Sequence, residues 1–300
     1  MSKKQKIAIV GATGAVGEEL LNVLDELDFP VESILPLASA KSVGSEVEFK
    51  GKAYKVKELT ENVFKENPID IAFFSAGGSV SEKYAKFAVE SGAVVIDNTS
   101  HFRMEKDVPL VVPECNPEDI KDWKKTGIIA NPNCSTIQMV QVLKPLNDAF
   151  NLKRVDVSTY QAASGAGKEG MQELVKAMQS FFVFKLDEFK SQIFPYTLAL
   201  NLIPQIDVFM DNDYTKEELK MVNETQKILH KNLEVSATCV RVPVLRSHSE
   251  AITMHFEKEI DVKKAKEILE KAPSVVVIDD PKNKKYPVRI AQKWLELKNE

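Results

Sequence analysis

The sequence predicts an α/β protein, with a doubly wound parallel sheet first and an α+β domain with a mixed sheet second. In the first half, short apolar runs alternate with amphipathic stretches, which is typical of a parallel sheet covered on both faces. After about residue 150, strand-like runs are separated by long helical or irregular stretches. A length of 300 residues suits two domains of ~150 residues each. We expect the boundaries 1–133 and 134–287, with a last helix, 288–300, joining the first domain.

The elements of the first half follow from apolar runs of strand length. The run KIAIV at 6–10 has the continuous apolar character of a strand buried on both faces. By the same pattern we predict strands at 33–39, 69–75, 93–97 and 128–130, with helices at 18–27 and 80–91.

In the second half the strands are fewer and farther apart. We predict strands at 155–162, 238–245, 251–256 and 274–278. Residues 251–256 alternate like a strand with one solvated face. The segment 288–300 is an amphipathic helix with Ile290, Ala291, Trp294 and Leu297 on one side.

Composition excludes several classes of protein. With 44% hydrophobic and 28% charged residues, the chain is not disordered or of low complexity. A net charge of -4 gives no basic excess for nucleic acid or an anionic membrane, and no apolar run reaches the ~18 residues of a membrane helix. The basic N-terminus and its apolar run are broken by three glycines and lead into two glutamates, so we expect no signal peptide.

Three cysteines, Cys115, Cys134 and Cys239, are too few and too scattered for a disulfide framework. The sequence contains no CxxC pair, so we expect no metal site of the zinc-finger type. A reduced, cytoplasmic setting is the simplest interpretation.

A glycine-rich turn, GATGAVG at 11–17, joins the first predicted strand to the first helix. Glycine permits the tight turn and a close approach to a pyrophosphate, and the helix N-terminus offers free N–H groups. In this strand–turn–helix context the pattern favours a Rossmann-type dinucleotide site over a plain turn. The predicted contacts are Gly11, Thr13, Gly14, Ala15, Val16 and Gly17.

The end of the second strand favours NADP over NAD. NAD-binding folds usually place an acidic residue there for the ribose 2′-hydroxyl. Here the chain has Ser39, Lys41 and Ser42 and no acid, which suits a 2′-phosphate. A solvated loop lysine is the alternative interpretation of Lys41.

Cys134 follows the segment NPN at 131–133, where the strand 128–130 ends and a helix begins. A helix N-terminus stabilises a thiolate, so we expect a lowered thiol pKa and a nucleophile. A small core residue is the alternative, and it is what we expect of Cys115 and Cys239 in their apolar surroundings. A nucleophilic thiol beside a nicotinamide predicts a covalent adduct with a carbonyl and hydride transfer at that carbon.

Seven separated segments, in order along nearly the whole chain, resemble one family. They are GATGAVG at 11–17, SHFRM at 100–104, VPECN at 112–116, NPNCSTIQ at 131–138, QAASGAGKEG at 161–170, NETQKI at 223–228 and RVPVLRSHSEA at 241–251. The chain thus resembles the aspartate-β-semialdehyde dehydrogenases. The resemblance implies reversible, NADPH-dependent reductive dephosphorylation of L-4-aspartyl phosphate to L-aspartate 4-semialdehyde, a step toward lysine (by way of diaminopimelate), threonine and methionine.

The resemblance also implies roles for single residues. Cys134 would form the thioester, His248 would be the acid/base catalyst, and Gln161 would orient the acyl intermediate. The implied substrate contacts are Arg241 for the carboxylate, Glu224 for the ammonium, and Lys227, Arg103 and Asn133 for the phosphate. Ser164 and Gly165 form a second glycine-rich turn near the nicotinamide, with a purely structural turn as the alternative. Without the resemblance, His248 would be an ordinary strand histidine, and Glu224 and Lys227 an exposed helical ion pair.

One segment departs from the family pattern. The family has several dozen residues, including a Gly/Ala-rich stretch that returns to the cofactor, where Pro287 here meets Val288 directly. Our hypothesis is that these residues are omitted from the sequence, because deleting a strand and a cofactor loop should harm folding and binding.

Three other functions remain to be compared. N-acetyl-γ-glutamyl-phosphate reductase shares the acyl-phosphate chemistry, but its acylated substrate amine needs no carboxylate such as Glu224. Glyceraldehyde-3-phosphate dehydrogenase does not match the surroundings of Cys134. A non-catalytic NADP-binding sensor would not need Cys134, Gln161, Arg241 and His248 together. We expect a homodimer or homotetramer formed by the second domain, small-molecule ligands, and no nucleic acid, membrane or metal.

Overall fold

The computed structural model describes residues 3–288 and contains two main sheets. The first is a six-stranded parallel sheet in the order β5-β2-β1-β6-β7-β8. Its strands are β1 (Gln5–Val10), β2 (Val31–Ala38), β5 (Lys57–Glu58), β6 (Ile71–Phe74), β7 (Val94–Asp97) and β8 (Ile128–Ala130). This order has the doubly wound Rossmann pattern, with the strand order reversing between β1 and β6. Ligands bind such sheets in the crevice at the carboxyl ends of the strands at this point.

Helices cover both faces of this sheet: α1 (Ala15–Glu26), α3 (Gly78–Glu90) and the short α2 (Val63–Glu66). Ile7 and Ile9 of β1 belong to the core cluster that contains residues of α1. Ala8 and Val10 belong to the cluster on the other face, which contains residues of α3. Because successive strand residues point to opposite faces, the fully apolar run of β1 is buried on both sides.

Gly17 fixes the contact between β1 and α1. A Cβ atom at Gly17 would lie 2.3 Å from the carbonyl oxygen of Gly11 and 2.8 Å from the Cα of Ala12. No side chain longer than hydrogen fits there, because both neighbours are backbone atoms. The helix begins at Ala15, three residues before the predicted start, because Gly14 is its N-cap.

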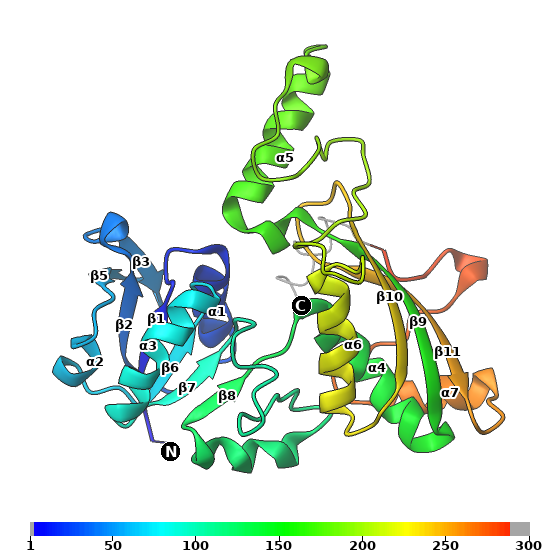
Figure 1. The fold of residues 1–300 in the computed structure, drawn as a ribbon, viewed down its shortest axis with the longest axis horizontal. Coiled ribbons are helices and arrows are strands. Elements are labelled where there is room, and N and C mark those ends of the chain that lie inside the picture. The colour runs from blue at the N-terminus through cyan, green and yellow to red at the C-terminus, as the bar shows by residue number, and fades with distance from the viewer. Residues whose placement is uncertain (1–2, 289–300) are drawn as a thin grey trace.

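The second sheet is mixed and has three strands, β9 (Leu152–Gln161), β10 (Glu234–Arg241) and β11 (Ser249–Phe256). β9 is central, parallel to β10 and antiparallel to β11. Helices α4 (Cys134–Phe150) and α6 (Lys216–Ile228) pack on one face of this sheet (Figure 1). The core there includes Met139 of α4, Val157 of β9 and Met221 of α6.

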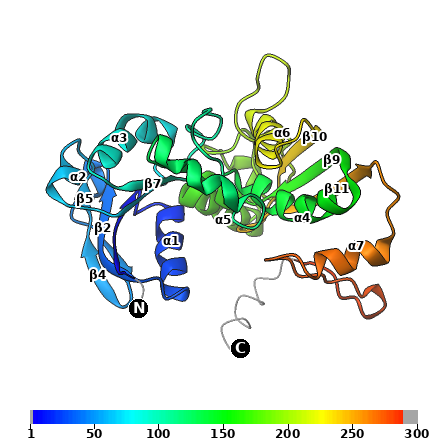
Figure 2. The same ribbon diagram turned by 90° about the horizontal axis from the view of Figure 1, so that it is seen from below.

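The opposite face of this sheet lies open in the single chain. Ser158 and Tyr160 of β9 point to this side and are exposed. Above the sheet, α5 (Gly167–Phe182) projects as an arm from the body of the molecule (Figure 1). Its end carries exposed apolar side chains, with Phe182 71% and Phe184 94% exposed. Helix α7 (Val262–Leu269) lies beyond the sheet on the side away from the first domain (Figure 2).

Most predicted elements are present, with shifted ends. The five predicted strands of the first half match β1, β2, β6, β7 and β8 to within two residues at each end. The strand predicted at 238–245 is wrong by four residues, since β10 ends at Arg241 and Pro243 has no N–H for a strand ladder. A two-stranded hairpin, β3 (Glu46–Phe49) with β4 (Lys52–Lys55), was not predicted.

The predicted strand at 274–278 is absent from the structure. This run joins none of the sheets formed by the described residues, and Val276 is 80% exposed. An apolar run becomes a strand only where another strand can pair with it, and none of the strands within residues 3–288 pairs with this one. The predicted helix at 288–300 lies outside the described residues, apart from Val288. Within residues 3–288, no helix has both the length and the apolar character required to cross a membrane.

Candidate active site

Cys134 is the first residue of α4 and follows directly from the edge strand β8. Asn133 caps the helix, since its Oδ1 accepts hydrogen bonds from the N–H groups of Ser135 (2.9 Å) and Thr136 (3.2 Å). The cap holds the first helical turn, and the Cys134 thiol is exposed to a cavity of about 610 Å³.

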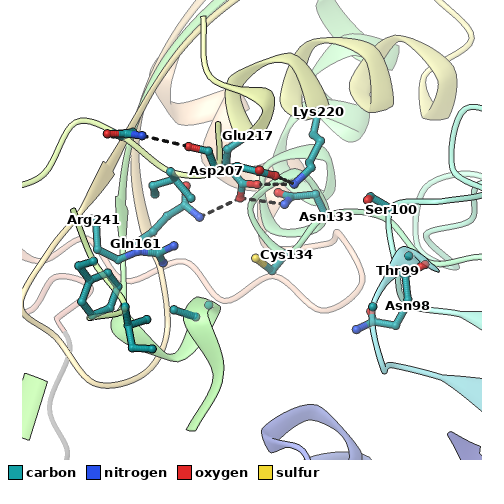
Figure 3. Close-up of a pocket in the computed structure, with 18 of the residues that line it drawn as sticks. Asn98, Thr99, Ser100, Asn133, Cys134, Gln161, Asp207, Glu217, Lys220 and Arg241 are labelled. Carbon is teal, nitrogen blue, oxygen red and sulfur yellow. Dashed lines mark hydrogen bonds and ion pairs between the residues drawn. The ribbon is translucent and has the colours of Figure 1, made fainter. Parts of the chain in front are cut away.

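Both domains line this cavity. From the parallel sheet come Ser75 after β6 and the segment 98–100 after β7. From the second domain come Gln161, Arg241, Glu217 and Lys220. In Figure 3, Cys134 lies between Arg241 and Gln161 on one side and Asn98, Thr99 and Ser100 on the other. The cavity therefore joins the crevice of the dinucleotide fold to the thiol.

His248 contacts the thiol directly. Its Nε2 lies 3.2 Å from the Sγ of Cys134, and its Nδ1 accepts a hydrogen bond from the N–H of Ala162 at 3.0 Å. Because Nδ1 acts as the acceptor, the neutral ring carries its proton on Nε2, facing the sulfur. His248 is thus oriented to donate to the sulfur.

The pKa of Cys134 is raised, which corrects the expectation of a lowered value. Burial is the largest cause, and the negative charge of Glu217 raises the pKa further. The N–H of Ser135 at the helix start and the charges of Arg103 and Arg241 act in the opposite direction, but they do not prevail. The sequence located the helix N-terminus correctly. Its lowering effect on the thiol pKa is smaller than the raising effects of burial and of the Glu217 carboxylate.

Glu217 is the acidic group beside the thiol, and sequence reasoning missed it. Its Oε1 accepts hydrogen bonds from the Nδ2 of Asn133 (2.9 Å) and the Nε2 of Gln161 (3.0 Å). Its Oε2 pairs with the Nζ of Lys220 at 3.0 Å, and Lys220 also pairs with Asp207 at 2.9 Å. Burial raises the pKa of Glu217, but Lys220 and the two amide donors lower it by more, so the carboxylate stays charged. This cluster forms one wall of the cavity (Figure 3).

Glu224, the residue expected to bind the substrate ammonium, does not line this cavity. It is 1% exposed and forms a buried ion pair with the Nη1 of Arg103 at 3.0 Å. Its other oxygen accepts from the backbone N–H of Asn133 at 2.6 Å. The structure therefore does not bring this carboxylate to the cavity, but holds it in the ion pair with Arg103. Glu224 instead ties the start of α4 to Arg103.

Lys227 is likewise not available for a phosphate. Its ammonium donates to three backbone carbonyls, those of Arg103 (2.7 Å), Glu105 (2.8 Å) and Val108 (2.9 Å). An ammonium has three protons, so this side chain is saturated. The sequence contains a signal that could have offered the alternative pair, although not the choice between the two. The spacing E-x-x-K occurs twice on α6, at 217–220 and 224–227, and the cavity is lined by the first pair.

The other expected substrate residues lie at the cavity. Arg103 lines it, and its Nε and Nη2 donate to the backbone oxygens of Asn131 (2.9 Å) and Asn98 (3.0 Å). Asn133 lines it too, although its side chain is already used in capping α4 and binding Glu217. Arg241, at the end of β10, donates from Nη1 to the carbonyl of Ala162 at 2.6 Å. Gln161 is buried beside it and accepts from the hydroxyl of Thr159.

The expected cofactor residues lie where a dinucleotide would need them. The turn 11–17 follows β1, and the N-cap Gly14 has no side-chain hydrogen bond that would cover the first N–H groups of α1. Ser39 caps a single 3-10 turn, Ala40–Ser42, directly after β2, and no acidic side chain intervenes. Ser164 and Gly165 lie in a 3-10 turn beside Arg241. These residues fit a dinucleotide.

Two family models match the chain. The NAD binding domain of semialdehyde dehydrogenases matches residues 6–123, and the dimerisation domain of these enzymes matches residues 143–294. Together they include all of the second sheet, and the first sheet apart from Gln5 of β1 and strand β8.

Similar proteins carry a consistent name. An aspartate-semialdehyde dehydrogenase of Campylobacter jejuni is 85% identical over the whole of both chains, and one of Aquifex aeolicus is 55% identical over 95% of this chain and 84% of its own length. Among solved structures, aspartate semialdehyde dehydrogenase II of Vibrio cholerae, complexed with ASA, has a TM-score of 0.92 and 45% identity, covering 97% of this chain and 84% of that one. The enzyme of Candida albicans, solved with NADP, has a TM-score of 0.67 and 27% identity, covering 90% and 76%.

The alignment with the Campylobacter protein also gives the number of family residues that this chain lacks. It spans 342 positions for the 300 residues of this chain, so 42 positions have no residue here. That agrees in size with the several dozen family residues expected between Pro287 and Val288. With two matching domains and relatives this similar over nearly all of its length, the chain belongs to the aspartate-semialdehyde dehydrogenase family.

Proposed function

We propose that this protein catalyses the reversible, NADPH-dependent reductive dephosphorylation of L-4-aspartyl phosphate to L-aspartate 4-semialdehyde, in the biosynthesis of lysine, threonine and methionine. The observation that carries the proposal is the contact of 3.2 Å between the Sγ of Cys134, which lines a cavity shared by both domains, and the Nε2 of His248. Family membership supplies the substrate class. NADP is favoured over NAD because β2 ends in Ser39, Lys41 and Ser42 without an acid.

The reaction begins at Cys134. Cys134 first loses its thiol proton to solvent, and the thiolate then attacks the acyl carbon: a C–S bond forms, and the C–O bond to phosphate breaks to leave a thioester. NADPH, when bound, supplies the hydride that brings this carbon to the aldehyde level. Breaking the C–S bond then releases the aldehyde and returns the thiolate to Cys134. His248 donates from Nε2 to the sulfur and serves as the acid/base group at that atom.

Substrate recognition follows from the charges around the thiol. Arg241 provides a guanidinium for the substrate carboxylate, as a bidentate fork. Glu217 takes the role first assigned to Glu224 and pairs with the substrate ammonium, because its charged carboxylate lines the cavity. Lys220, with Arg103 and Asn133, provides the positive and polar side of the cavity for phosphate.

Glu217 also separates this function from its nearest rival. The substrate of N-acetyl-γ-glutamyl-phosphate reductase has an acylated, uncharged nitrogen, which offers no positive charge to the Glu217 carboxylate. The carboxylate that argues against this rival function is therefore Glu217 and not Glu224, as the sequence had suggested. A non-catalytic NADP sensor would not need the Cys134–His248 contact.

A homodimer formed through the second domain is part of the proposal. The domain match is to a dimerisation domain, and the outer face of β9 carries the exposed Tyr160. The arm at α5 ends in Phe182 and Phe184, both largely exposed. Light scattering should give twice the chain mass, and Phe184→Glu should lower it; a fourfold mass would indicate a homotetramer. The cytoplasmic setting stays a prediction.

The decisive test is NADPH formation at 340 nm from L-aspartate semialdehyde, phosphate and NADP⁺. We expect a phosphate-dependent rate that Cys134→Ala abolishes. Cys115→Ala, which removes a buried thiol outside the cavity, is the matched control and should retain the rate. Equal rates in the Cys134→Ala variant, or a rate with NAD⁺ far above that with NADP⁺, would contradict the proposal.

A further inference from the structure

A buried carboxylate outside the reaction site holds one wall of the cavity. Glu173 of α5 is 8% exposed. Its Oε2 accepts from the backbone N–H groups of Gln192 and Ile193, both at 2.8 Å, and its Oε1 accepts from the N–H of Phe194 at 3.3 Å. Among the described residues no cation forms an ion pair with Glu173. Three consecutive N–H groups thus surround one carboxylate.

The segment fixed in this way reaches the substrate side of the cavity. Ile193 and Phe194 line it together with Arg241. The Phe194 ring centroid lies 5.9 Å from the Cζ of Arg241, within the range of a cation–π contact. On its other side the ring packs on α5, where a Cβ at Gly170 would lie 3.2 Å from the Phe194 Cζ. Gly170 and Glu173 are one helical turn apart, so a single face of α5 supports this segment.

Arg241 is confined on its remaining sides as well. A Cβ at Gly165 would lie 2.7 Å from its Nη1, which already donates to the carbonyl of Ala162. The guanidinium therefore sits between the turn at Gly165 and the ring of Phe194. The backbone N–H of the residue that carries this ring is bound by Glu173.

We propose that Glu173 is a positioning residue for substrate recognition: by accepting three consecutive N–H groups, it places Phe194 beneath Arg241 and so orients the guanidinium for the substrate carboxylate. The inference rests on the proposed function of Arg241. A bidentate fork requires both N–H groups to point at the two oxygens, so a small rotation of the guanidinium costs affinity for a carboxylate. It leaves the phosphate side, at Lys220, unaffected.

The test is protection of Cys134 from alkylation by iodoacetamide, measured by mass spectrometry on the full chain. Glu173→Gln keeps one acceptor oxygen but turns an NH₂ group toward an N–H that now has no partner. We expect the half-protecting concentration of L-aspartate semialdehyde to rise about tenfold, the loss expected when a charge-assisted pair is weakened. Half-protection by inorganic phosphate, and the alkylation rate without ligand, should each stay within about twofold of the unmodified chain.

Controls separate positioning from general damage. Glu169→Gln removes an exposed carboxylate one turn earlier on α5 and should change none of the three values. Phe194→Leu should reproduce the semialdehyde effect, and the double variant should show no further loss, because both changes act through one contact. If Glu173→Gln does not fold, Glu173→Asp, which keeps the charge but shortens the reach, replaces it.

Two results would overturn the inference. One is semialdehyde protection unchanged in a folded Glu173 variant; the other is an equal loss for semialdehyde and phosphate, which indicates a merely structural role. Failure of the proposed function looks different, because then the semialdehyde would not protect Cys134 even in the unmodified chain.

Discussion

His248 faces Cys134 with its Nε2 3.2 Å from the sulfur, and its other ring nitrogen is held by the backbone N–H of Ala162. The backbone N–H of Ala162 therefore fixes the imidazole in one orientation and one neutral tautomer. Because this donor belongs to the backbone, substituting a nearby side chain does not remove it. A single hydrogen bond connects the proposed acid/base residue to the proposed nucleophile, although the two residues are 114 positions apart in the sequence.

His248→Asn tests this relationship. We expect kcat to fall by about 10²–10⁴, the usual contribution of a positioned general acid/base group, with little change in KM. Initial rates at 340 nm give both constants. His255→Asn changes an exposed histidine on β11, the strand that follows His248; His255 pairs with Asp156, and the variant should keep the rate. A His248→Asn variant with more than a tenth of the activity would exclude the role.

Glu217→Gln tests the raised pKa of the nucleophile. The carboxylate raises the pKa of the Cys134 thiol, so its removal lowers that pKa and leaves more thiolate at neutral pH. We expect the pH profile of iodoacetamide alkylation to move to lower pH in the variant. At the same time the semialdehyde should bind more weakly, because its ammonium loses a partner. An unchanged or opposite shift of the profile would contradict the assignment.

Glu224→Gln distinguishes a structural carboxylate from a substrate contact. Removing one partner of the buried pair leaves the Arg103 charge uncompensated, so we expect the free energy of unfolding to fall by about 3–5 kcal/mol. Urea denaturation followed by circular dichroism measures this. Lys125→Gln breaks an exposed pair with Asp122 and should cost less than about 1 kcal/mol. Full stability with lost semialdehyde binding would restore Glu224 as a ligand.

Glu250 of β11 predicts a pH dependence of stability. Burial raises the pKa of this carboxyl to about 7, against an opposing hydrogen bond with Gln138, and its Oε1 has no hydrogen-bond partner among the described residues. Between its ordinary value of 4.5 and about 7, the folded protein holds a proton that the unfolded chain has released, so this contribution to stability falls as pH rises.

Glu250→Gln should remove that slope. We expect the variant to gain about 2 kcal/mol relative to the unmodified chain on going from pH 5 to pH 8, as measured by urea unfolding at both pH values. Glu257→Gln, at an exposed position beyond the end of the strand, is the control and should show no such difference. A gain of equal size at both pH values would indicate an effect other than titration.

The first domain could be predicted closely because its signals are local. The run KIAIV, the glycines after it and the next apolar runs each depend on neighbours within a few residues, and the order of strands follows the rules of a doubly wound sheet. The run at 274–278 failed for the opposite reason. Its apolar pattern is that of a strand, but pairing requires a second segment, and that is not a property of the run itself.

By itself the sequence determined the family, the position of Cys134 at the start of a helix, and the candidates His248, Gln161 and Arg241. Only the tertiary structure decided between the two E-x-x-K pairs of α6, because both present the same residues at the same helical spacing. Glu224 meets Arg103, 121 positions away, whereas Glu217 meets Asn133, 84 positions away, at the cavity wall. The raised pKa of the thiol has the same origin, since burial and a distant carboxylate, both products of packing, outweigh the helix N-terminus that the sequence could locate.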